Sequence, residues 1–478
     1  MPQESNLDQR LQAARLQLEP RGQLHVLRWW PELPPAQRAS LLSQIKAVSW
    51  DVLDPVLPTL VRSTPEPETQ ARLLPPTVMS PAGTPGESNR DNRAAQRGRE
   101  LLSAGKVAAF TVAGGQGTRL GYDGPKGTVV VSPIGQRTLF QLFAETVLAA
   151  RQKYAAAIPW YVMTSPANHA ATVDFFSQRH CFGLPKHDVI FFQQGTLPAF
   201  DFHGRLLLES KDSLALAPDG HGGSLKALVS SGAIHNMRQR GVEIISYFQV
   251  DNPLVKPFDP LFVGLHALTG SEMSTKVARK ADDLEKVGNL CLRDGKLVVV
   301  EYSDFPEGLA KVRNPDGTRT FDFGNLAMHL LAVDFVDRVA GRSFQLPLRR
   351  ADKAVPCLDE RGCRVQSDRP NAVKLEMFVF DALPLARSPL LLEVDRAEEF
   401  SPIKNASGVD SLETARRDQL RRACRWLESS GLRVPRRPDG QPDIAVYIAP
   451  TFALDSADVA SKRDQIPPLT PAAKLVLE

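Results

Sequence analysis

The amino-acid sequence predicts an α/β fold built on a doubly wound, mainly parallel sheet. Short apolar segments alternate with segments of helical spacing between residues 107 and 250. The first apolar segment leads directly into a glycine-rich loop, and polar residues follow two later apolar segments at once. Strands that alternate with helices form right-handed crossovers, so we expect the carboxyl ends of these strands, and the loop, at one edge of the sheet.

The residues before this sheet are expected to form an N-terminal piece. Apolar residues recur at helical spacing over 7–50, and prolines divide this part into short helices. Prolines then crowd together with Ser, Thr and Glu over 54–92, which indicates a linking segment with little regular structure. A helix is predicted from about 93 to 104, just before the first strand.

The central part contains the strands and helices of the predicted sheet. The first strand begins at 107 and runs for six or seven residues, and three more are expected over 160–164, 189–195 and 242–250. Helices are expected between them, over 138–154, 167–179 and 225–239.

A hairpin and a small C-terminal part are expected after the sheet. Residues 275–302 alternate like antiparallel strands, with a turn at Asp294-Gly295, and 371–381 contains a further strand or strand–helix junction. The composition changes beyond about 390, where a helix over 414–429 and a strand over 444–448 are expected. We therefore predict three parts: a helical and proline-rich N-terminal segment (1–104), a central α/β domain (105–390) and a small C-terminal α+β domain (391–478).

Composition and charge exclude several classes of protein. The 58 Lys and Arg residues against 54 Asp and Glu residues leave a net charge of +4, which favours neither nucleic acid nor a membrane surface as a partner. The N-terminus is polar and no apolar run approaches about 18 residues, which argues against a signal peptide and a membrane span. Five scattered cysteines without a CxxC pair argue against a zinc site or a disulfide framework. We therefore expect a cytoplasmic protein.

The loop after the first strand has the composition of an anion-binding cradle. Five glycines lie between 114 and 124, accompanied by the cations Arg119 and Lys126. Glycine allows successive backbone N–H groups to converge on an anion, and the helix expected after such a loop adds its positive end. An ordinary glycine-rich turn is the simpler interpretation, and the two cations favour the cradle.

Two common glycine motifs do not fit this loop. The P-loop requires Gly-Lys followed by Ser or Thr, but Pro125 separates Gly124 from Lys126. The dinucleotide fingerprint has Leu120 at its sixth position, and no acidic residue closes a βαβ unit about twenty residues further on. Residues 113–120, with Pro125-Lys126 downstream, instead resemble the nucleotidyltransferase loop of sugar-nucleotide pyrophosphorylases.

Transfer of a nucleotidyl group brings two polyanions together, so such a site must supply positive charge. Arg119 and Lys126 are the candidate cations, and a divalent ion is the other natural neutraliser. Asp251 is the first charged residue after the apolar strand and is therefore our candidate ligand for Mg²⁺ or Mn²⁺. An aspartate that caps a turn is an equally simple interpretation of the same position.

Other polar residues have simpler interpretations when each is taken alone. Residues 217–224 form a second glycine-rich turn, and His221 within it has no His or Cys partner at ligand spacing, which excludes zinc. Glu301, Asn325 and Lys404 are each typical of a surface polar group or a cap. Five arginines in the predicted C-terminal helix are expected to form a solvated basic face, and binding of an anionic partner is the alternative interpretation. They are Arg416, Arg417, Arg421, Arg422 and Arg425.

Ten segments together resemble the eukaryotic-type UDP-N-acetylhexosamine pyrophosphorylases, within the wider UDP-sugar pyrophosphorylase family. They occur in the order of the family and cover roughly residues 105–410. The segments are 113–121, 125–127, 138–141, 191–195, 217–220, 250–252, 300–303, 324–325, 374–381 and 400–406.

The resemblance implies a Rossmann-like nucleotidyltransferase domain that forms a UDP-sugar and pyrophosphate from UTP and a sugar 1-phosphate, with Mg²⁺. It implies catalytic roles for Arg119 and Lys126 at the triphosphate and for Lys404 at the reacting centre, with Asp251 holding the metal and contacting substrate. The residues implied to bind the uridine are Gly114, Gly115, Gln194 and Gly220, and those implied to bind or enclose the sugar are His221, Gly288, Glu301, Asn325, Phe378 and Phe380.

The identity of the sugar has two interpretations. The acetylhexosamine enzymes commonly have Asn at the place of His221, whereas Gly-His-Gly resembles the UDP-glucose branch. We expect N-acetylglucosamine 1-phosphate, with glucose 1-phosphate as the alternative. A catalytically silent UDP-sugar-binding protein is the alternative of another class, and the presence of Arg119, Lys126, Asp251 and Lys404 argues against it. No feature of the sequence indicates an oligomeric state.

Overall fold

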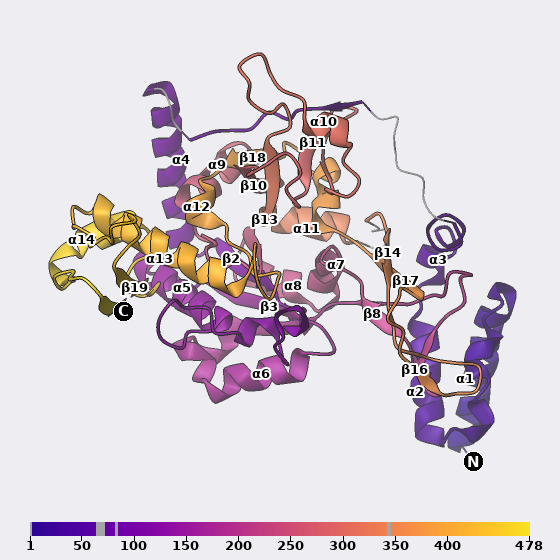
Figure 1. Ribbon diagram of the computed structural model, residues 1–478. Coiled ribbons are helices and arrows are strands. Elements are labelled where there is room, and N and C mark those ends of the chain that lie inside the picture. Colours follow the sequence, from indigo (N-terminus) through magenta and orange to yellow (C-terminus); the bar gives the residue numbers. More distant parts are fainter. Residues whose placement is uncertain (1, 64–71, 82–84, 342–345) are drawn as a thin grey trace. The chain divides into compact units, whose positions relative to one another are not determined.

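The computed structural model describes residues 2–63, 72–81, 85–341 and 346–478, which fall into two compact units (Figure 1). Unit 1 contains the described residues of Met1–Glu68, Gln194–Lys226 and Ser343–Asp381. Unit 2 contains those of Thr69–Gln193, Ala227–Arg342 and Ala382–Glu478. The domain borders that we predict at 104 and 390 stay a prediction.

A large, mainly parallel sheet forms the centre of unit 2, which confirms the predicted fold class. Four parallel strands stand in the order β4–β3–β2–β9, with bounds Val189–Gln193, Trp160–Thr164, Val107–Val112 and Ile244–Gln249. The sheet continues with β13 (Phe323–Ala332), which pairs antiparallel with β9. Beyond it, β10 (Met273–Arg279) pairs antiparallel with β13 and parallel with β18 (Leu390–Glu393).

The register of the parallel strands brings their carboxyl ends to one edge. Val112 of β2 pairs with Met163 of β3 and with Gln249 of β9. The glycine loop follows β2 and Asp251 follows β9, so both leave the sheet at the same edge, as the sequence predicts. Ligands of doubly wound sheets collect at this edge.

The parallel strands are mainly apolar because helices cover both faces of such a sheet. Residues 107–111 and 160–164 are fully buried. The helix α5 (Leu139–Tyr154) begins where the sequence predicts, and the Thr138 side chain caps it by accepting a hydrogen bond from Gln141 N at 3.2 Å. Phe143 of α5 packs edge-on against Phe248 of β9, with ring centroids 5.2 Å apart.

Two helices of unit 2 cross at unusually short range. α4 (Pro85–Ser103) and α9 (Pro260–Leu268) lie side by side in Figure 1. A Cβ on Gly98 would lie 1.8 Å from Pro260 O, and one on Gly264 would lie 1.7 Å from Ala94 O, so this crossing requires both glycines. The predicted start of α4 at about 93 is wrong, because the helix extends back to Pro85.

The other predicted elements of unit 2 occur with local differences. The predicted helix over 225–239 is two helices, α7 (Gly223–Ser230) and α8 (Ala233–Gln239), separated by Gly232 at φ 79°. The hairpin is confirmed, with Asp294 and Gly295 both at positive φ as a type I′ turn requires. Its strands are β11 (Asn289–Arg293) and β12 (Lys296–Val300); β1 (Leu73–Leu74), α6 (His169–Gln178), α10 (Glu307–Ala310) and α11 (Val333–Val339) complete this part.

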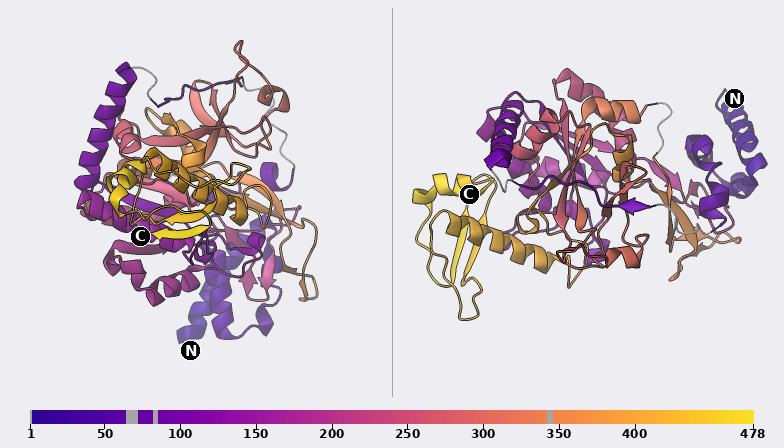
Figure 2. Two further views of the ribbon diagram at one scale, coloured as in Figure 1. Left: turned by 60° about the vertical axis from the view of Figure 1, so that its left-hand side comes forward. Right: turned by 90° about the horizontal axis from the view of Figure 1, so that it is seen from above.

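The C-terminal part of unit 2 combines a long helix with two parallel strands. Figure 2 shows α13 (Leu412–Ser429) beside β19 (Ile444–Ile448) and β20 (Ala473–Leu477), drawn in gold and yellow. The sequence analysis did not predict β20, whose partner is β19. The short helices α12 (Arg396–Glu399) and α14 (Ser456–Ser461) flank this group.

The prediction of a solvated basic face on α13 is wrong for three of its five arginines. Arg416 donates to Val130 O at 2.9 Å, and Arg422 donates to Leu254 O at 3.2 Å. Arg425 pairs with Glu398 at 2.8 Å. These arginines therefore fasten α13 to the rest of unit 2, and only Arg417 and Arg421 are exposed.

Unit 1 begins with the short helices that the sequence predicts, α1 (Pro2–Leu18), α2 (Pro35–Ala47) and α3 (Trp50–Leu53). Its strands form four antiparallel pairs: β5 (Thr196–Pro198) with β8 (Leu216–Pro218), β6 (Leu208–Ser210) with β7 (Ser213–Leu214), β14 (Arg349–Lys353) with β17 (Ala372–Glu376), and β15 (Cys357–Leu358) with β16 (Arg364–Val365). No helix among the described residues of the chain combines the length and apolar character needed to cross a membrane.

Candidate active site

The glycine loop of unit 2 folds back on itself after β2. Gly117 N donates to Gly124 O at 2.9 Å, and Lys126 N donates to Gly115 O at 3.1 Å. Two short 3₁₀ turns, Thr118–Leu120 and Lys126–Thr128, follow. The helix expected after the loop is α5, which begins at Leu139, so its N-terminus does not directly adjoin the glycines. The groups that the loop itself offers to an anion are backbone amides and side chains.

Arg119 and Lys126 occupy different surroundings within the loop. Arg119 lies in the first 3₁₀ turn with its side chain exposed. Lys126 is half-buried, and its Nζ donates to Ile403 O at 3.2 Å. Gly115 is exposed, and a Cβ placed on it would meet no protein atom within 4 Å. Packing does not require glycine at 115, so this stretch of backbone is open to a ligand.

A buried asparagine that the sequence analysis missed holds the start of the loop. Asn168, 1% exposed, donates from Nδ2 to Ala113 O at 2.9 Å and to Gly115 O at 3.3 Å. Its Oδ1 accepts from Ser165 N at 2.9 Å. In the sequence Asn168 lies at the start of the predicted helix 167–179, where asparagine is common as a capping residue, so no local pattern distinguishes it.

Three segments of unit 2 meet at the carboxyl edge of the sheet. Ile403 O accepts from Lys126 Nζ, and Ile403 N donates to Asp251 O at 2.9 Å. Lys404, the next residue, has its Nζ 3.8 Å from Asp410 Oδ2 and its side chain 40% exposed. The structure thus brings Lys126, Asp251 and Lys404 together from parts of the sequence more than a hundred residues apart.

A second buried asparagine joins two of these segments. Asn252 Nδ2 donates to Glu399 O at 2.7 Å, and its Oδ1 accepts from Ser401 N and from Leu254 N, each at 3.1 Å. Asn252 is 3% exposed. This residue therefore fixes the backbone beside Asp251 against the backbone that leads to Lys404.

A buried ion triad adjoins this junction through Glu399, which lies in the segment that leads to Ile403. Lys276 Nζ lies 2.6 Å from Glu399 and 2.7 Å from Asp259, and Lys276 is 1% exposed. Burial opposes the charged lysine, but the two carboxylates outweigh it and raise the pKa of Lys276. Lys276 is on β10, so the triad connects the sheet to the segment that precedes Lys404.

The donors at this edge suit a magnesium ion held partly by substrate. Asp251 is half-buried and close enough to Asp410 to affect its titration; burial raises the pKa of Asp410, and Lys404 opposes that rise. Among the described residues no three His, Cys, Asp or Glu side chains gather as metal ligands. Magnesium usually takes one or two carboxylates together with substrate phosphates, which Asp251 fits.

Gly288, Glu301 and Asn325 lie together at the end of the hairpin in unit 2. Asn325 N donates to Gly288 O at 2.9 Å. A Cβ on Gly288 would lie 2.5 Å from Val299 Cγ1 and 3.3 Å from Glu301 Oε1, so only glycine fits beside this carboxylate. The structure therefore brings together three residues that the sequence analysis could place only one at a time.

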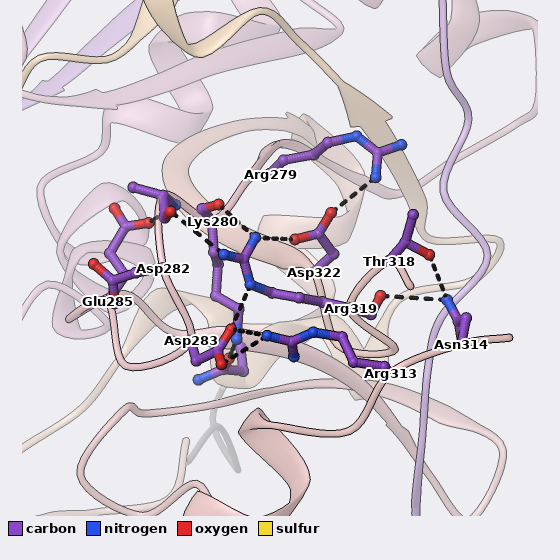
Figure 3. A network of polar contacts seen from close by, with 12 residues as sticks. Arg279, Lys280, Asp282, Asp283, Glu285, Arg313, Asn314, Thr318, Arg319 and Asp322 are labelled. Carbon is purple, nitrogen blue, oxygen red and sulfur yellow. Dashed lines mark hydrogen bonds and ion pairs between the residues drawn. The ribbon is translucent and has the colours of Figure 1, made fainter. Parts of the chain in front are cut away.

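An ion-pair network braces the loops on either side of Gly288 and Asn325 (Figure 3). Arg319 is at its centre and donates to Asp283 Oδ1 at 2.7 Å, to Lys280 O at 3.0 Å and to Asp322 Oδ1 at 3.1 Å. Arg313 donates to both carboxylate oxygens of Asp283, to Oδ1 at 2.7 Å and to Oδ2 at 2.8 Å. The network ties the loop 280–288 to the loop 311–322 that leads into β13.

In unit 1, two glycines allow the turn 217–223 to pack on the segment that follows β17. Gly222 N donates to Met377 O at 2.8 Å, and Met377 N donates to Asp219 O at 2.8 Å. Gly220 has φ 84°, and a Cβ on it would lie 2.4 Å from Met377 O. This close approach of two backbones explains the second glycine-rich turn.

His221, Phe378 and Phe380 form one aromatic cluster in unit 1. The His221 and Phe378 rings are stacked, 5.0 Å apart and inclined by 3°, and Phe380 lies 5.7 Å from His221. His221 Nδ1 accepts from Val379 N at 3.1 Å. Burial, with a smaller effect of Arg349, lowers the pKa of His221 to about 4. The ring is therefore neutral at pH 7, with its proton on Nε2.

Comparison with known proteins relates most of the chain to one group of proteins. Residues 84–417 match the family model described as UTP–glucose-1-phosphate uridylyltransferase. The chain is 37% identical over 468 residues to the human UDP-N-acetylhexosamine pyrophosphorylase-like protein 1, covering 92% of each chain. It is 35% identical over 430 residues to the UDP-N-acetylglucosamine pyrophosphorylase of Saccharomyces cerevisiae, covering 86% of this chain and 90% of the yeast protein.

Solved structures show the same relationship. A crystal structure of a putative UDP-N-acetylglucosamine pyrophosphorylase from Entamoeba histolytica superposes with a TM-score of 0.76 at 30% identity, over 85% of this chain and all of that one. A UDP-glucose phosphorylase from Trypanosoma brucei superposes with a TM-score of 0.62 at 18% identity, over 86% and 85% of the two chains, and shows the fold alone.

Proposed function

Since the chain belongs to the UTP–glucose-1-phosphate uridylyltransferase family, we propose that it makes UDP-N-acetylglucosamine from UTP and N-acetylglucosamine 1-phosphate. A phosphate oxygen of the sugar attacks the α-phosphorus of UTP, the bond from that phosphorus to the bridging oxygen breaks, and pyrophosphate leaves. The observation that most supports this proposal is the junction at Ile403. It brings Lys126, Asp251 and Lys404 to the edge of the sheet where the glycine loop begins.

The junction provides the charge that this reaction requires. Two unit charges 4 Å apart repel by about 4 kcal/mol at an effective dielectric near 20, and both substrates are polyanions. We propose that Arg119 and Lys126 neutralise the triphosphate and that Lys404 contacts the phosphates at the reacting centre. When bound, a divalent ion held by Asp251 supplies further neutralisation and alignment. In-line transfer needs positioning and charge, not a side-chain nucleophile.

We propose uridine contacts for Gly114, Gly115, Gln194 and Gly220, and sugar contacts for Gly288, Glu301 and Asn325. The clustering of the last three supports the sugar site, because a carboxylate and an amide, both able to hydrogen-bond sugar hydroxyls, lie together beside Gly288. Phe378 and Phe380 are proposed to enclose the sugar. His221 is stacked on Phe378, so the aromatic cluster fixes its position.

Glucose 1-phosphate is the second candidate substrate, because Gly-His-Gly is found here in place of an asparagine-containing turn. Pyrophosphate release from UTP with each sugar phosphate distinguishes the two. We expect at least a tenfold higher kcat/KM for N-acetylglucosamine 1-phosphate. A preference for glucose 1-phosphate would reject our first choice, and tight UTP binding without turnover of either sugar would instead indicate a silent binding protein.

Gly115→Ala is expected to weaken UTP use without affecting the fold. A methyl group at 115 meets no protein atom, and φ there is not positive, so the free energy of unfolding should stay unchanged. The methyl group would lie where a nucleotide must approach the backbone, and we expect kcat/KM for UTP to fall about 10- to 100-fold.

Gly308→Ala in α10 is the matched control for this change, since a Cβ there also meets no atom. We expect it to leave kcat/KM unchanged. Equal activity of the two alanine variants would show that the nucleotide does not approach residue 115.

Arg319→Met is expected to raise KM for the sugar phosphate more than KM for UTP. The substitution removes hydrogen bonds to Asp283, Lys280 O and Asp322, and so loosens both loops beside Gly288 and Asn325. We expect the free energy of unfolding to fall by about 1–2 kcal/mol, since Arg319 is partly exposed. Steady-state kinetics in both substrates provide the measurement, and an equal rise of the two KM values would contradict a specific effect on the sugar side.

A further inference from the structure

A buried carboxyl group that has no assigned role lies beside Gln194 in unit 1. Asp219 is 5% exposed and directly follows β8, and its N donates to Gly195 O at 3.1 Å. Its carboxyl lies between two glycines: a Cβ on Gly195 would be 2.4 Å from Asp219 Oδ2, and one on Gly223 would be 2.2 Å from Oδ1. Any other residue at 195 or 223 would displace this group. The chain therefore keeps a slot of the shape and size of a carboxyl group.

Burial of the Asp219 carboxyl group in this slot lowers the stability of the folded chain. Oδ1 of Asp219 is buried without a hydrogen-bond partner among the described residues. Burial raises the pKa of Asp219 to about 6, opposed by Lys226 and by a hydrogen bond with the Gln194 side chain. A buried acid that is not fully satisfied is retained at a functional site more often than in a structural core.

Gln194, the hydrogen-bond partner of Asp219, has one side-chain group that donates hydrogen bonds and one that accepts them. The Gln194 side chain carries an amide nitrogen that donates and a carbonyl oxygen that accepts. An ionised carboxyl group only accepts, so the hydrogen bond between them uses the Nε2 end of Gln194. The Oε1 end of Gln194 is then the one left for a ligand.

We propose that Asp219 is a positioning residue that fixes the Gln194 amide so that its oxygen faces the nucleotide base, and thereby selects uracil over cytosine. This inference rests on the proposed function, in which Gln194 contacts the uridine. Uracil carries an N–H at position 3, which donates to an amide oxygen. Cytosine has a lone pair at that position and an amino group beside it, so the same oxygen repels its ring nitrogen.

The selectivity is expected to depend on pH. The charged groups on the elements packed against this carboxyl are Lys226 of α7 and Glu376 of β17, whose Cβ is 3.1 Å from the Cβ position of Gly220. Above about pH 6 Asp219 is ionised and accepts from Gln194. Below it the protonated carboxyl also donates, so the amide can turn and present its nitrogen to the base. The preference for UTP should therefore fall as pH is lowered through 6.

Asp219→Asn tests the proposal, with UTP and CTP compared as substrates for the same sugar phosphate. The asparagine fills the slot but both donates and accepts at all pH values, so it holds Gln194 in neither orientation. We expect the ratio of kcat/KM for UTP to that for CTP to fall about 10- to 100-fold at pH 7.5. Part of this change should be a gain with CTP, and the ratio should no longer vary between pH 5.5 and 7.5.

Asp201→Asn is the matched control, since Asp201 is a half-buried turn residue of unit 1 that accepts from His203 N and Arg205 N. We expect it to leave the ratio and its pH dependence unchanged. Thermal unfolding separates selectivity from folding, and Asp219→Asn should unfold at no lower temperature than the natural protein at pH 7.5.

Two results would overturn the proposal while leaving the proposed function intact. One is a parallel loss with UTP and CTP, which indicates a purely structural Asp219. The other is a ratio that is independent of pH in the natural protein. Failure of the proposed function gives a different result, namely no turnover of UTP by the natural protein at all.

Discussion

Asp251→Asn is expected to lower kcat by about a thousandfold or more and to abolish its dependence on Mg²⁺, while the fold survives. A metal that neutralises developing charge on a transferring phosphoryl group is worth several kcal/mol, and an amide in place of the carboxylate removes the negative charge that we propose holds the ion. The backbone of Asp251 contributes to the junction through its oxygen, which accepts from Ile403 N and is retained in the variant. The change is therefore confined to the metal.

The measurement is a titration of pyrophosphate release against Mg²⁺ for the natural protein and the variant, with circular dichroism as the check on folding. Asp410→Asn is the matched comparison, because Asp410 lies beside Lys404 but follows no strand of the sheet. We expect it to cost at most about tenfold in kcat, through the loss of its contact to Lys404. Near-natural activity of Asp251→Asn would remove Asp251 as the metal ligand.

Lys276→Met is expected to destabilise the protein by about 3–5 kcal/mol. The substitution leaves Glu399 buried and Asp259 partly buried without their shared cation, and breaking a buried ion group by removing one partner has a cost of this size. Activity should be lost at temperatures where the variant is still largely folded, because Glu399 leads directly to the segment that holds Lys404. Denaturant unfolding, followed by Trp fluorescence, measures the change.

Lys311→Met is the control for this prediction, since Lys311 forms an exposed ion pair with Glu307 at i,i+4. Such pairs contribute little, and its unfolding curve should coincide with that of the natural protein. The double change Lys276→Met with Glu399→Gln should recover part of the loss, because it removes one of the two unpaired charges. A Lys276→Met variant as stable as the natural protein would contradict a structural role for the triad.

The sequence predicted those parts of the fold where a local pattern determines the structure. The alternation of apolar strands and helices predicted the parallel sheet, Thr138 marked the start of α5, and Asp294-Gly295 marked the hairpin turn. The pattern failed where contacts between distant segments decide. α4 packs on α9 and extends back to Pro85, eight residues before its predicted start, and β20 pairs with β19 from the other side of α14 in the sequence.

In the candidate site too, some residues could be predicted from a local pattern and others could not. The glycine loop and Asp251 follow strands of a predictable sheet, so their common edge could be inferred. The roles of Asn168, Asn252 and Asp219 could not be inferred, because their contacts are to backbone or side chains brought near only by folding. The arginines of α13 were misjudged for the same reason, since their partners lie on other elements.

The central claim is that the glycine loop and the junction at Ile403 gather a nucleoside triphosphate for displacement by a sugar phosphate. The most direct test is the release of pyrophosphate when N-acetylglucosamine 1-phosphate is added to the purified protein with UTP and Mg²⁺. The account predicts stoichiometric release of pyrophosphate and UDP-N-acetylglucosamine, abolished by Asp251→Asn. Absence of release with any sugar phosphate, together with no measurable affinity for UTP, would contradict it.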